Sequence, residues 1–181
     1  LPSGDSYSSS FSGGAGADTL SGGSGNDLIY GNLDSDRIVG GAGLDTLFGG
    51  QQSDLVFGLT GADQVYGNKQ NDTLYGGVGD DSMFGGQDDD LVFGEAGNDR
   101  VDGNRGNDTL FGGDGVDRFV ISKGNDVVQD FSPAEDRIET LDAFSAINQA
   151  IMSGSLVLTD SDGDTLTLTG VTSTLNEGYF I

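Results

Sequence analysis

The stretch that decides the fold lies between residues 13 and 30, which read GGAGADTLS (13–21) and then GGSGNDLIY (22–30). The nine-residue spacing continues without insertion or deletion to Val120, so twelve units share one register. In every unit the first position is Gly, the sixth is Asp and the eighth is apolar. Self-similarity at such a short fixed period predicts a solenoid, in which each unit packs on its neighbours.

The unit itself predicts one turn and one short strand. Gly at positions 1, 2 and 4 permits the positive φ angles of a sharp turn, and the residues after Asp alternate inward and outward as a strand does. Two units make a coil of 18 residues, and stacked coils place residues 18 apart above one another at about 4.8 Å. The position-8 side chains then form a core. The position-6 carboxylates form two rows that repel unless a divalent cation is shared between neighbours.

The pattern G-G-x-G-x-D-x-U-x, with U apolar, resembles the repeat of the RTX calcium-binding proteins. This resemblance implies an all-β fold, a right-handed parallel β-roll, with Ca²⁺ between successive turns. It also implies that each ion takes position-6 carboxylates together with backbone carbonyls of the Gly-rich loops, a hard oxygen set that suits Ca²⁺. A disordered Gly- and Asp-rich linker would not require an apolar residue in every unit.

The predicted metal ligands follow from this resemblance. The carboxylates are those of Asp27, Asp45, Asp63, Asp81, Asp99, Asp117, Asp18, Asp36, Asp54, Asp72, Asp90, Asp108 and Asp126. The backbone carbonyls are those of Gly22, Gly23, Ser24, Gly25, Gly40, Gly41, Ala42, Gly43, Gly58, Thr60, Gly61, Gly76, Gly77, Val78, Gly79, Gly94, Ala96, Gly97, Gly112, Gly113, Asp114 and Gly115. We expect about five to ten Ca²⁺ ions, no other cofactor and no catalytic residue.

The two rows of loops differ at position 4. The first row comprises the loops that begin at Gly22, Gly40, Gly58, Gly76, Gly94 and Gly112, and its position 4 is always Gly. The second row comprises the loops that begin at Gly13, Gly31, Gly49, Gly67, Gly85 and Gly103, and its position 4 runs Gly16, Asp34, Gln52, Gln70, Asp88 and Gly106. A side chain in a glycine conformation costs about 1 kcal/mol or more. One hypothesis is therefore that the first row binds five ions strongly, while the second row turns differently and is weaker or partly empty. The alternative is that Asp34 and Asp88 add ligands while Gln52 and Gln70 make amide contacts along the row.

Composition narrows the classes of function. With 30 acidic against 7 basic residues the net charge is −23, which makes a compact chain repel itself and argues against nucleic acid or an anionic membrane as partner. The chain has no Cys and no His, so oxygen must hold any metal. It also lacks H-E-x-x-H and G-x-S-x-G motifs, and we predict that it is not itself an enzyme. No apolar run approaches the roughly 20 residues of a membrane span, and no segment has the form of an N-terminal signal peptide.

Position 9 carries aromatic residues that should point outward in two ladders. One ladder is Tyr30, Phe48, Tyr66 and Phe84, and the other is Phe57, Tyr75, Phe93 and Phe111. Contiguous exposed apolar surface often marks an interface, so a cell-surface or self-assembly partner is one interpretation. The other is that the rings stabilise the coils by stacking, or lie under a neighbouring domain.

The repeat frame predicts three parts of the chain. Residues 1–12 form a degenerate first coil, residues 13–129 form the roll with an irregular last unit at 121–129, and residues 130–181 form a cap. The apolar spacing of Leu141, Phe144, Ile147, Asn148 and Ile151 predicts a short helix that stops at Gly154. Segments 156–159 and 165–169 predict a hairpin. The acidic turn between them lacks the spacing of an EF-hand loop.

The C-terminal region also resembles that of RTX proteins exported by type I secretion, in residues 126–131, in the hairpin and in the apolar terminus 179–181. The resemblance implies an uncleaved signal near the C-terminus, transient contact with an exporter, and a secreted or cell-surface location. We therefore expect an extracellular calcium-binding module that folds on Ca²⁺ and supports export of a larger protein. The alternatives are the tail of a secreted hydrolase or epimerase, or a surface-layer or adhesive module.

Overall fold

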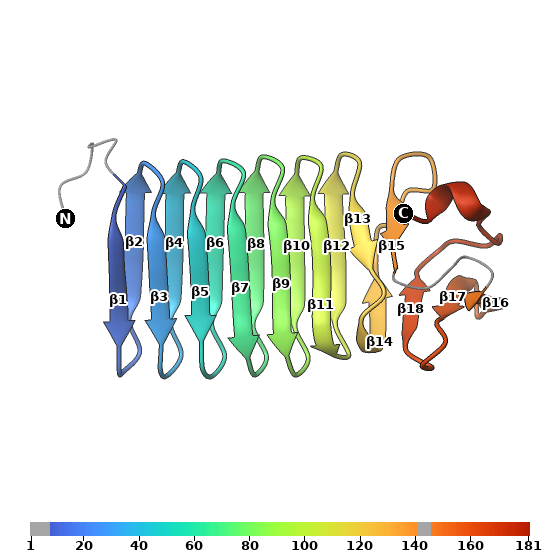
Figure 1. Ribbon diagram of the computed structural model, residues 1–181, viewed down its shortest axis with the longest axis horizontal. Coiled ribbons are helices and arrows are strands. Elements are labelled where there is room, and N and C mark those ends of the chain that lie inside the picture. Colours follow the sequence, from blue (N-terminus) through green and yellow to red (C-terminus); the bar gives the residue numbers. More distant parts are fainter. Residues whose placement is uncertain (1–7, 141–145) are drawn as a thin grey trace.

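The computed structural model describes residues 8–140 and 146–181, and its strands wind into a parallel β-roll (Figure 1). One layer contains β1 (Ser10–Gly14), β3 (Leu28–Asn32), β5 (Thr46–Gly50), β7 (Gln64–Lys69), β9 (Ser82–Gln87), β11 (Arg100–Gly106), β13 (Arg118–Val120) and β15 (Arg137–Glu139). The other contains β2 (Thr19–Ser24), β4 (Arg37–Ala42), β6 (Leu55–Thr60), β8 (Thr73–Val78), β10 (Leu91–Ala96), β12 (Thr109–Asp114) and β14 (Lys123–Val128). The predicted all-β fold and parallel β-roll are confirmed.

The strand register follows the repeat. From β1 to β14 each strand pairs in parallel with the strand two places along the chain, and the partners are 18 residues apart, as in Ile29↔Leu47 and Leu47↔Val65. Because side chains alternate along a strand, every position-8 residue points inward. From Ile29 to Val128 these side chains are fully buried and form one continuous core. Phe11 and Leu20, in the first coil, are only partly buried against it.

The loops use positive φ at positions 2 and 4, as predicted, but not at position 1. At Gly61, a position-4 residue, φ is +136°, and an added Cβ would collide with the carbonyl oxygen of Gly43 in the coil below. The expectation that position 1 also needs positive φ is wrong. Its glycine is required for space, because an added Cβ there would collide with the side chain of the Asp in the same unit.

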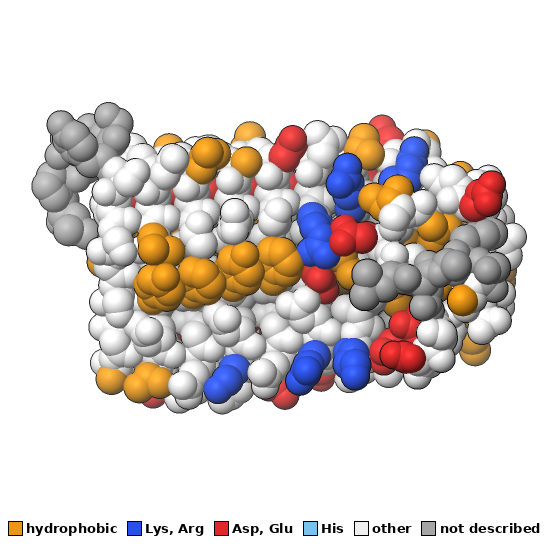
Figure 2. All heavy atoms as spheres, in the orientation of Figure 1, with side chains coloured by type: hydrophobic (Ala, Val, Ile, Leu, Met, Phe, Trp, Pro, Cys, Tyr) orange, Lys and Arg blue, Asp and Glu red, His pale blue; other side chains and the backbone are white. Residues whose placement is uncertain are grey.

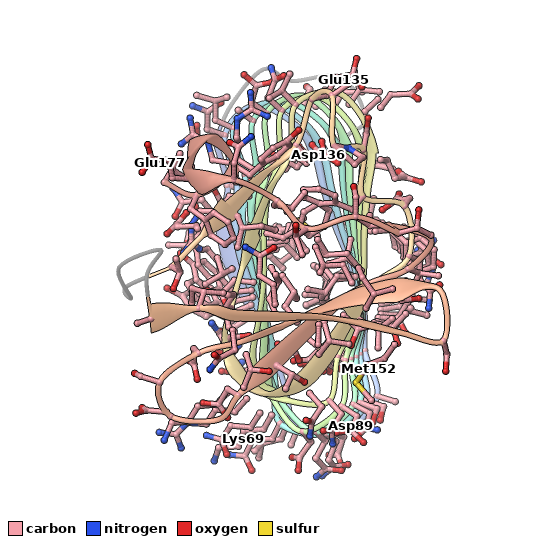
Figure 3. All side chains as sticks on the ribbon, turned by 90° about the vertical axis from the view of Figure 1, so that its right-hand side faces the viewer. Lys69, Asp89, Glu135, Asp136, Met152 and Glu177 are labelled. Atoms are coloured by element: carbon pink, nitrogen blue, oxygen red, sulfur yellow. The ribbon has the colours of Figure 1, made fainter. Side chains whose placement is uncertain are left out.

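The C-terminal end is a cap of strands. In the described residues β16 (Asn148–Met152), β17 (Ser155–Thr159) and β18 (Thr165–Leu168) form an antiparallel meander, and β18 pairs in parallel with β14. Buried leucines of β17 and β18 belong to the same hydrophobic core. Figure 3 looks along the roll from this end and shows the cap crossing in front of the superposed coils. The predicted hairpin of 156–159 with 165–169 is confirmed.

The predicted cap helix is wrong where the structure describes it. Leu141 and Phe144 lie outside the described residues, but Asn148 and Ile151 lie on strand β16. The reason is the turn: Ser153 and Gly154 both have positive φ, at +52° and +82°. That pair forms a two-residue hairpin turn, which pairs β16 with β17 rather than ending a helix. The helix within the described part is a short 3-10 turn, η2 (Glu177–Tyr179).

The position-9 rings form the two predicted ladders on the outside of the roll. Neighbouring rings stack face to face with centroids 4.7 to 5.0 Å apart. Figure 2 shows one ladder as an orange band across the odd-numbered strands, which ends at blue and red side chains. There the guanidinium of Arg100 lies over Phe84, 5.2 Å from the ring centroid, and forms an ion pair with Glu139 of β15 at 2.8 Å.

Among residues 8–140 and 146–181, no helix has the length and apolar character needed to cross a membrane.

Candidate metal sites

The position-6 carboxylates use their two oxygens differently. Within each row, Oδ1 of one Asp accepts the backbone N–H of the Asp one coil earlier. In the first row the amide of Asp45 donates to Oδ1 of Asp63 at 2.8 Å, and in the second row the amide of Asp54 donates to Oδ1 of Asp72 at 2.7 Å. These bonds fix every carboxylate against its neighbour and carry the row along the roll axis.

The other oxygen, Oδ2, is buried and has no hydrogen-bond partner among the described residues. This holds for Asp18, Asp27, Asp36, Asp45, Asp54, Asp63, Asp72, Asp81, Asp90, Asp99, Asp108 and Asp117. A buried ionised oxygen without a partner is costly, and native proteins satisfy such groups with few exceptions. Twelve equivalent orphans in two rows therefore indicate that a further group belongs beside them.

The glycine at position 1 faces this orphan oxygen. A Cβ added at Gly40 would collide with Oδ2 of Asp45, and one added at Gly22 would meet both Oδ2 of Asp27 and the carbonyl oxygen of Gly40. The unpartnered oxygen thus lies close against the loop backbone. Sequence reasoning missed this role of the position-1 glycine, although its presence in all twelve units was the available signal.

Burial raises the pKa of the position-6 carboxyls from Asp36 to Asp117. It raises the pKa of Asp72 and of Asp90 to about 8, and that of Asp81 and of Asp117 to about 7. Neighbouring carboxylates, such as Asp90 beside Asp72, raise the pKa further, while the backbone amide on Oδ1 opposes the shift. In the described part of the chain, Arg100 is the basic residue that forms ion pairs with acidic side chains, so basic groups do not neutralise the rows.

The donor set fits a hard divalent cation. Two position-6 carboxylates flank each interval between coils, and among the described residues no three acidic side chains form a group that could by itself hold a metal ion. A cation there would take its other ligands from loop carbonyls or water, as Ca²⁺ does. Some of the predicted loop carbonyls point into the space between coils: the carbonyl oxygen of Gly25, for example, is one that a Cβ added at Gly43 would collide with. Position-3 carbonyls of the first row, such as those of Ala42 and Thr60, also accept the position-4 amide of the preceding coil.

The two rows are alike at the carboxylates and differ at position 4. Asp34, Gln52, Gln70 and Asp88 keep positive φ, between +66° and +74°, whereas the first-row glycines there range from +104° to +147°. The second-row loops therefore stay left-handed in spite of their side chains. Asp34 and Asp88 accept the position-4 amides of Gly16 and Gln70, at 2.9 and 3.3 Å. The described structure shows no hydrogen bond from the amide side chain of Gln52 or of Gln70.

At the C-terminal end of each row stands a carboxylate whose Oδ2, unlike those of the regular units, accepts a hydrogen bond. Oδ1 of Asp126 accepts the amide of Asp108 at 3.1 Å, but its Oδ2 accepts the hydroxyl of Ser122 at 2.8 Å. In the first row Asp136 accepts the amides of Asp117 and Ser132, at 3.0 and 2.7 Å. The sequence reading missed Asp136 because it follows Asp117 by 19 residues and breaks the repeat frame.

Comparison with known proteins agrees with this geometry. The family model of the RTX calcium-binding nonapeptide repeat matches residues 3–38, 30–65, 57–92 and 93–128. The chain belongs to this family. The RTX repeat is a calcium-binding structural module, and the predicted resemblance is confirmed. A search of curated proteins found no match.

Two solved structures are similar to this RTX chain. The AlgE6R3 subunit of a mannuronan C5-epimerase from Azotobacter vinelandii is 26% identical, with a TM-score of 0.51, and the match covers 64% of this chain and 80% of that one. The extracellular lipase LipA from Serratia marcescens is 18% identical, with a TM-score of 0.36, over 91% of this chain and 40% of that one.

Proposed function

We propose that this chain is an extracellular calcium-binding β-roll that folds when Ca²⁺ binds and supports type I secretion of a larger protein. The observation that carries the proposal is the set of twelve buried Oδ2 atoms that have no hydrogen-bond partner within the described part of the chain. They make the metal-free roll unfavourable and give Ca²⁺ a place beside every neighbouring pair of carboxylates. The proposed ligands are the twelve position-6 carboxylates from Asp18 to Asp117, with loop carbonyls completing each shell.

Linkage gives the scale of the effect. A cation present at ten times its dissociation constant stabilises the folded state by about 1.4 kcal/mol per site. Five intervals between the six carboxylates of each row give ten sites, and ten such sites would supply about 14 kcal/mol. This contribution is as large as the free energy of unfolding of a whole domain, which is about 5 to 15 kcal/mol. Calcium would therefore decide whether the roll is folded.

Folding on calcium suits export of the chain in an unfolded state. Where Ca²⁺ is scarce, the carboxylate rows and the net charge of −23 would keep the chain extended enough to pass through a narrow exporter. In the calcium-rich exterior the same carboxylates would bind ions and the roll would form. The C-terminal region, residues 130–181, is the proposed cap and secretion signal.

Far-UV circular dichroism of chelator-treated protein during titration with Ca²⁺, and separately with Mg²⁺, tests this function. We expect a cooperative change from coil to β-structure with Ca²⁺ alone, because each ion orders a turn that its neighbour shares. A chain already folded at neutral pH in excess chelator would contradict the proposal. The roll would then be a constitutive scaffold.

The similarity to the AlgE6R3 subunit favours a second candidate, in which this module is the tail of a secreted polysaccharide-modifying enzyme. The parent protein with and without residues 1–181 would be compared for activity and for its amount outside the cell. Lost export with unchanged specific activity supports the secretion role. Lost activity of protein that is still exported supports a role within the enzyme.

A further inference from the structure

The last unit of the second row differs from the earlier ones at its carboxylate. Residues 121–129 read ISKGNDVVQ, so Ile121 and Ser122 replace the Gly at position 1 and the Gly or Asn at position 2. The side chain of Asp126 is fully buried, as in the other units. Its Oδ2 nevertheless accepts a hydrogen bond from the hydroxyl of Ser122 at 2.8 Å, whereas Oδ2 of Asp108, one coil earlier, has no such partner in the described structure.

Position 1 gives an independent reason for the difference. At Gly103 an added Cβ would collide with Oδ2 of Asp108, so an unpartnered Oδ2 of that kind requires glycine. Ile121 carries a side chain at the equivalent place, and there Oδ2 cannot lie as it does in the regular units. The oxygen instead turns to a donor from its own loop. Both substitutions therefore change the same carboxylate oxygen.

We propose that Ile121 and Ser122 close the second row to metal, so that no Ca²⁺ binds between Asp108 and Asp126. The hydroxyl of Ser122 takes the place that the cation has in the regular intervals. The second row then holds ions only between Asp18 and Asp108, and Asp126 is a structural hydrogen-bond acceptor. This inference rests on the proposed calcium function of the rows.

The first row ends in the same chemical way. Oδ2 of Asp136 accepts the backbone amide of Ser132 at 2.7 Å, and Oδ1 accepts the amide of Asp117 at 3.0 Å. A protein donor thus satisfies the outermost carboxylate of each row. In the second row the donor is a side chain, so a substitution can remove it.

The test is the number of ions bound by the whole chain, counted by native mass spectrometry at saturating Ca²⁺. Restoring the regular unit with Ile121→Gly and Ser122→Gly together should add one ion, and adding Asp126→Asn to that double variant should remove it again. Asp126→Asn in the natural chain should leave the count unchanged. Ser53→Gly is the matched control, since Ser53 is an exposed loop serine without a hydrogen bond from its side chain in the described structure.

The ion counts distinguish a closed interval between Asp108 and Asp126 from an open one. An unchanged count in the folded double variant overturns the inference, and so does loss of an ion in Asp126→Asn alone. If the double variant does not fold by circular dichroism, Asp126→Asn still decides by comparison with Asp108→Asn, which should lose an ion. A natural chain that binds no Ca²⁺ would instead refute the proposed function, and the two failures are thereby distinguished.

Discussion

At the scale of single residues, the position-6 aspartate has two separate roles. Oδ1 accepts a backbone amide and holds one coil to the next, while Oδ2 is buried and has no hydrogen-bond partner in residues 8–140 and 146–181. The first role stabilises the roll in any solution. The second destabilises the roll unless a cation is present, since burying an unsatisfied charge costs more than a hydrogen bond returns. One side chain thus both builds the fold and makes it depend on metal.

Replacement of Asp81 by Asn should act in opposite directions with and without calcium. The amide keeps an oxygen to accept the Asp63 N–H but removes the charge from two adjoining intervals. In Ca²⁺ we expect a loss of up to about 3 kcal/mol, from two sites of about 1.4 kcal/mol each. In chelator the variant should be more stable than the natural chain. Urea unfolding in Ca²⁺ and the β-structure content by circular dichroism in chelator, across the pH range in which the metal-free roll forms, measure this.

The control for that variant is Asp114→Asn, which removes the same charge from an exposed position-3 side chain. It should change stability little in either solution, because exposed charges interact weakly. Destabilisation of Asp81→Asn in chelator as well as in Ca²⁺ would show that the buried charge is not what opposes folding.

The metal-free roll should lose stability as pH rises. An unfolded Asp has a pKa near 3.9, whereas burial raises the pKa of Asp54 and Asp99 to about 6 and that of Asp72 and Asp90 to about 8. Between these values the folded chain holds more protons than the unfolded chain, so the free energy of unfolding falls with rising pH. Circular dichroism of chelated protein from about pH 5 to 8.5 should show β-structure decreasing. A signal that increases with pH would show that burial does not raise the pKa of these carboxyls.

At the scale of strands and loops, the repeat was enough to predict register, core and ladders, because a fixed nine-residue period leaves one way to stack Ile29, Leu47 and Val65. The cap was harder to predict. Ile147 and Ile151 suit a helix, but the Ser153–Gly154 turn paired the segment with β17 instead. The orphan Oδ2 atoms could not be predicted from spacing, since their burial depends on the glycine of the same loop and on the coil above.

The left-handed loops give a matched pair of substitutions. Gln52 has φ of +71°, so Gln52→Gly should stabilise the calcium-bound roll by about 1 kcal/mol through relief of backbone strain. Gly61→Ala, at position 4 of the first row, should destabilise it by more than 1 kcal/mol or so, because its Cβ would collide with the carbonyl of Gly43. Thermal unfolding in Ca²⁺ compares them. If Gln52→Gly raised the stability by as much as Gly61→Ala lowered it, the loops of the two rows would be equivalent at position 4.

At the scale of the whole molecule, charge and shape should change together. The metal-free chain of 181 residues carries −23 and, if fully unfolded, should have a radius of gyration of about 45 Å. A compact chain of that length has about 16 Å, and the elongated roll somewhat more. Small-angle scattering during a Ca²⁺ titration should follow this contraction, with its midpoint at the Ca²⁺ concentration of the dichroism change. A compact chain in chelator would argue against export in the unfolded state.

The 18-residue coil also limits how such a chain can change in length. Inserting two units adds one coil and lengthens each ring ladder by one step of 4.7 to 5.0 Å. Every later strand then stays in its original layer. Inserting a single unit would move every later strand to the opposite layer. Arg100 would then no longer lie over Phe84 at the end of its ladder. Gene duplications in this chain should therefore be tolerated in even numbers of repeats, and odd ones should be eliminated by selection.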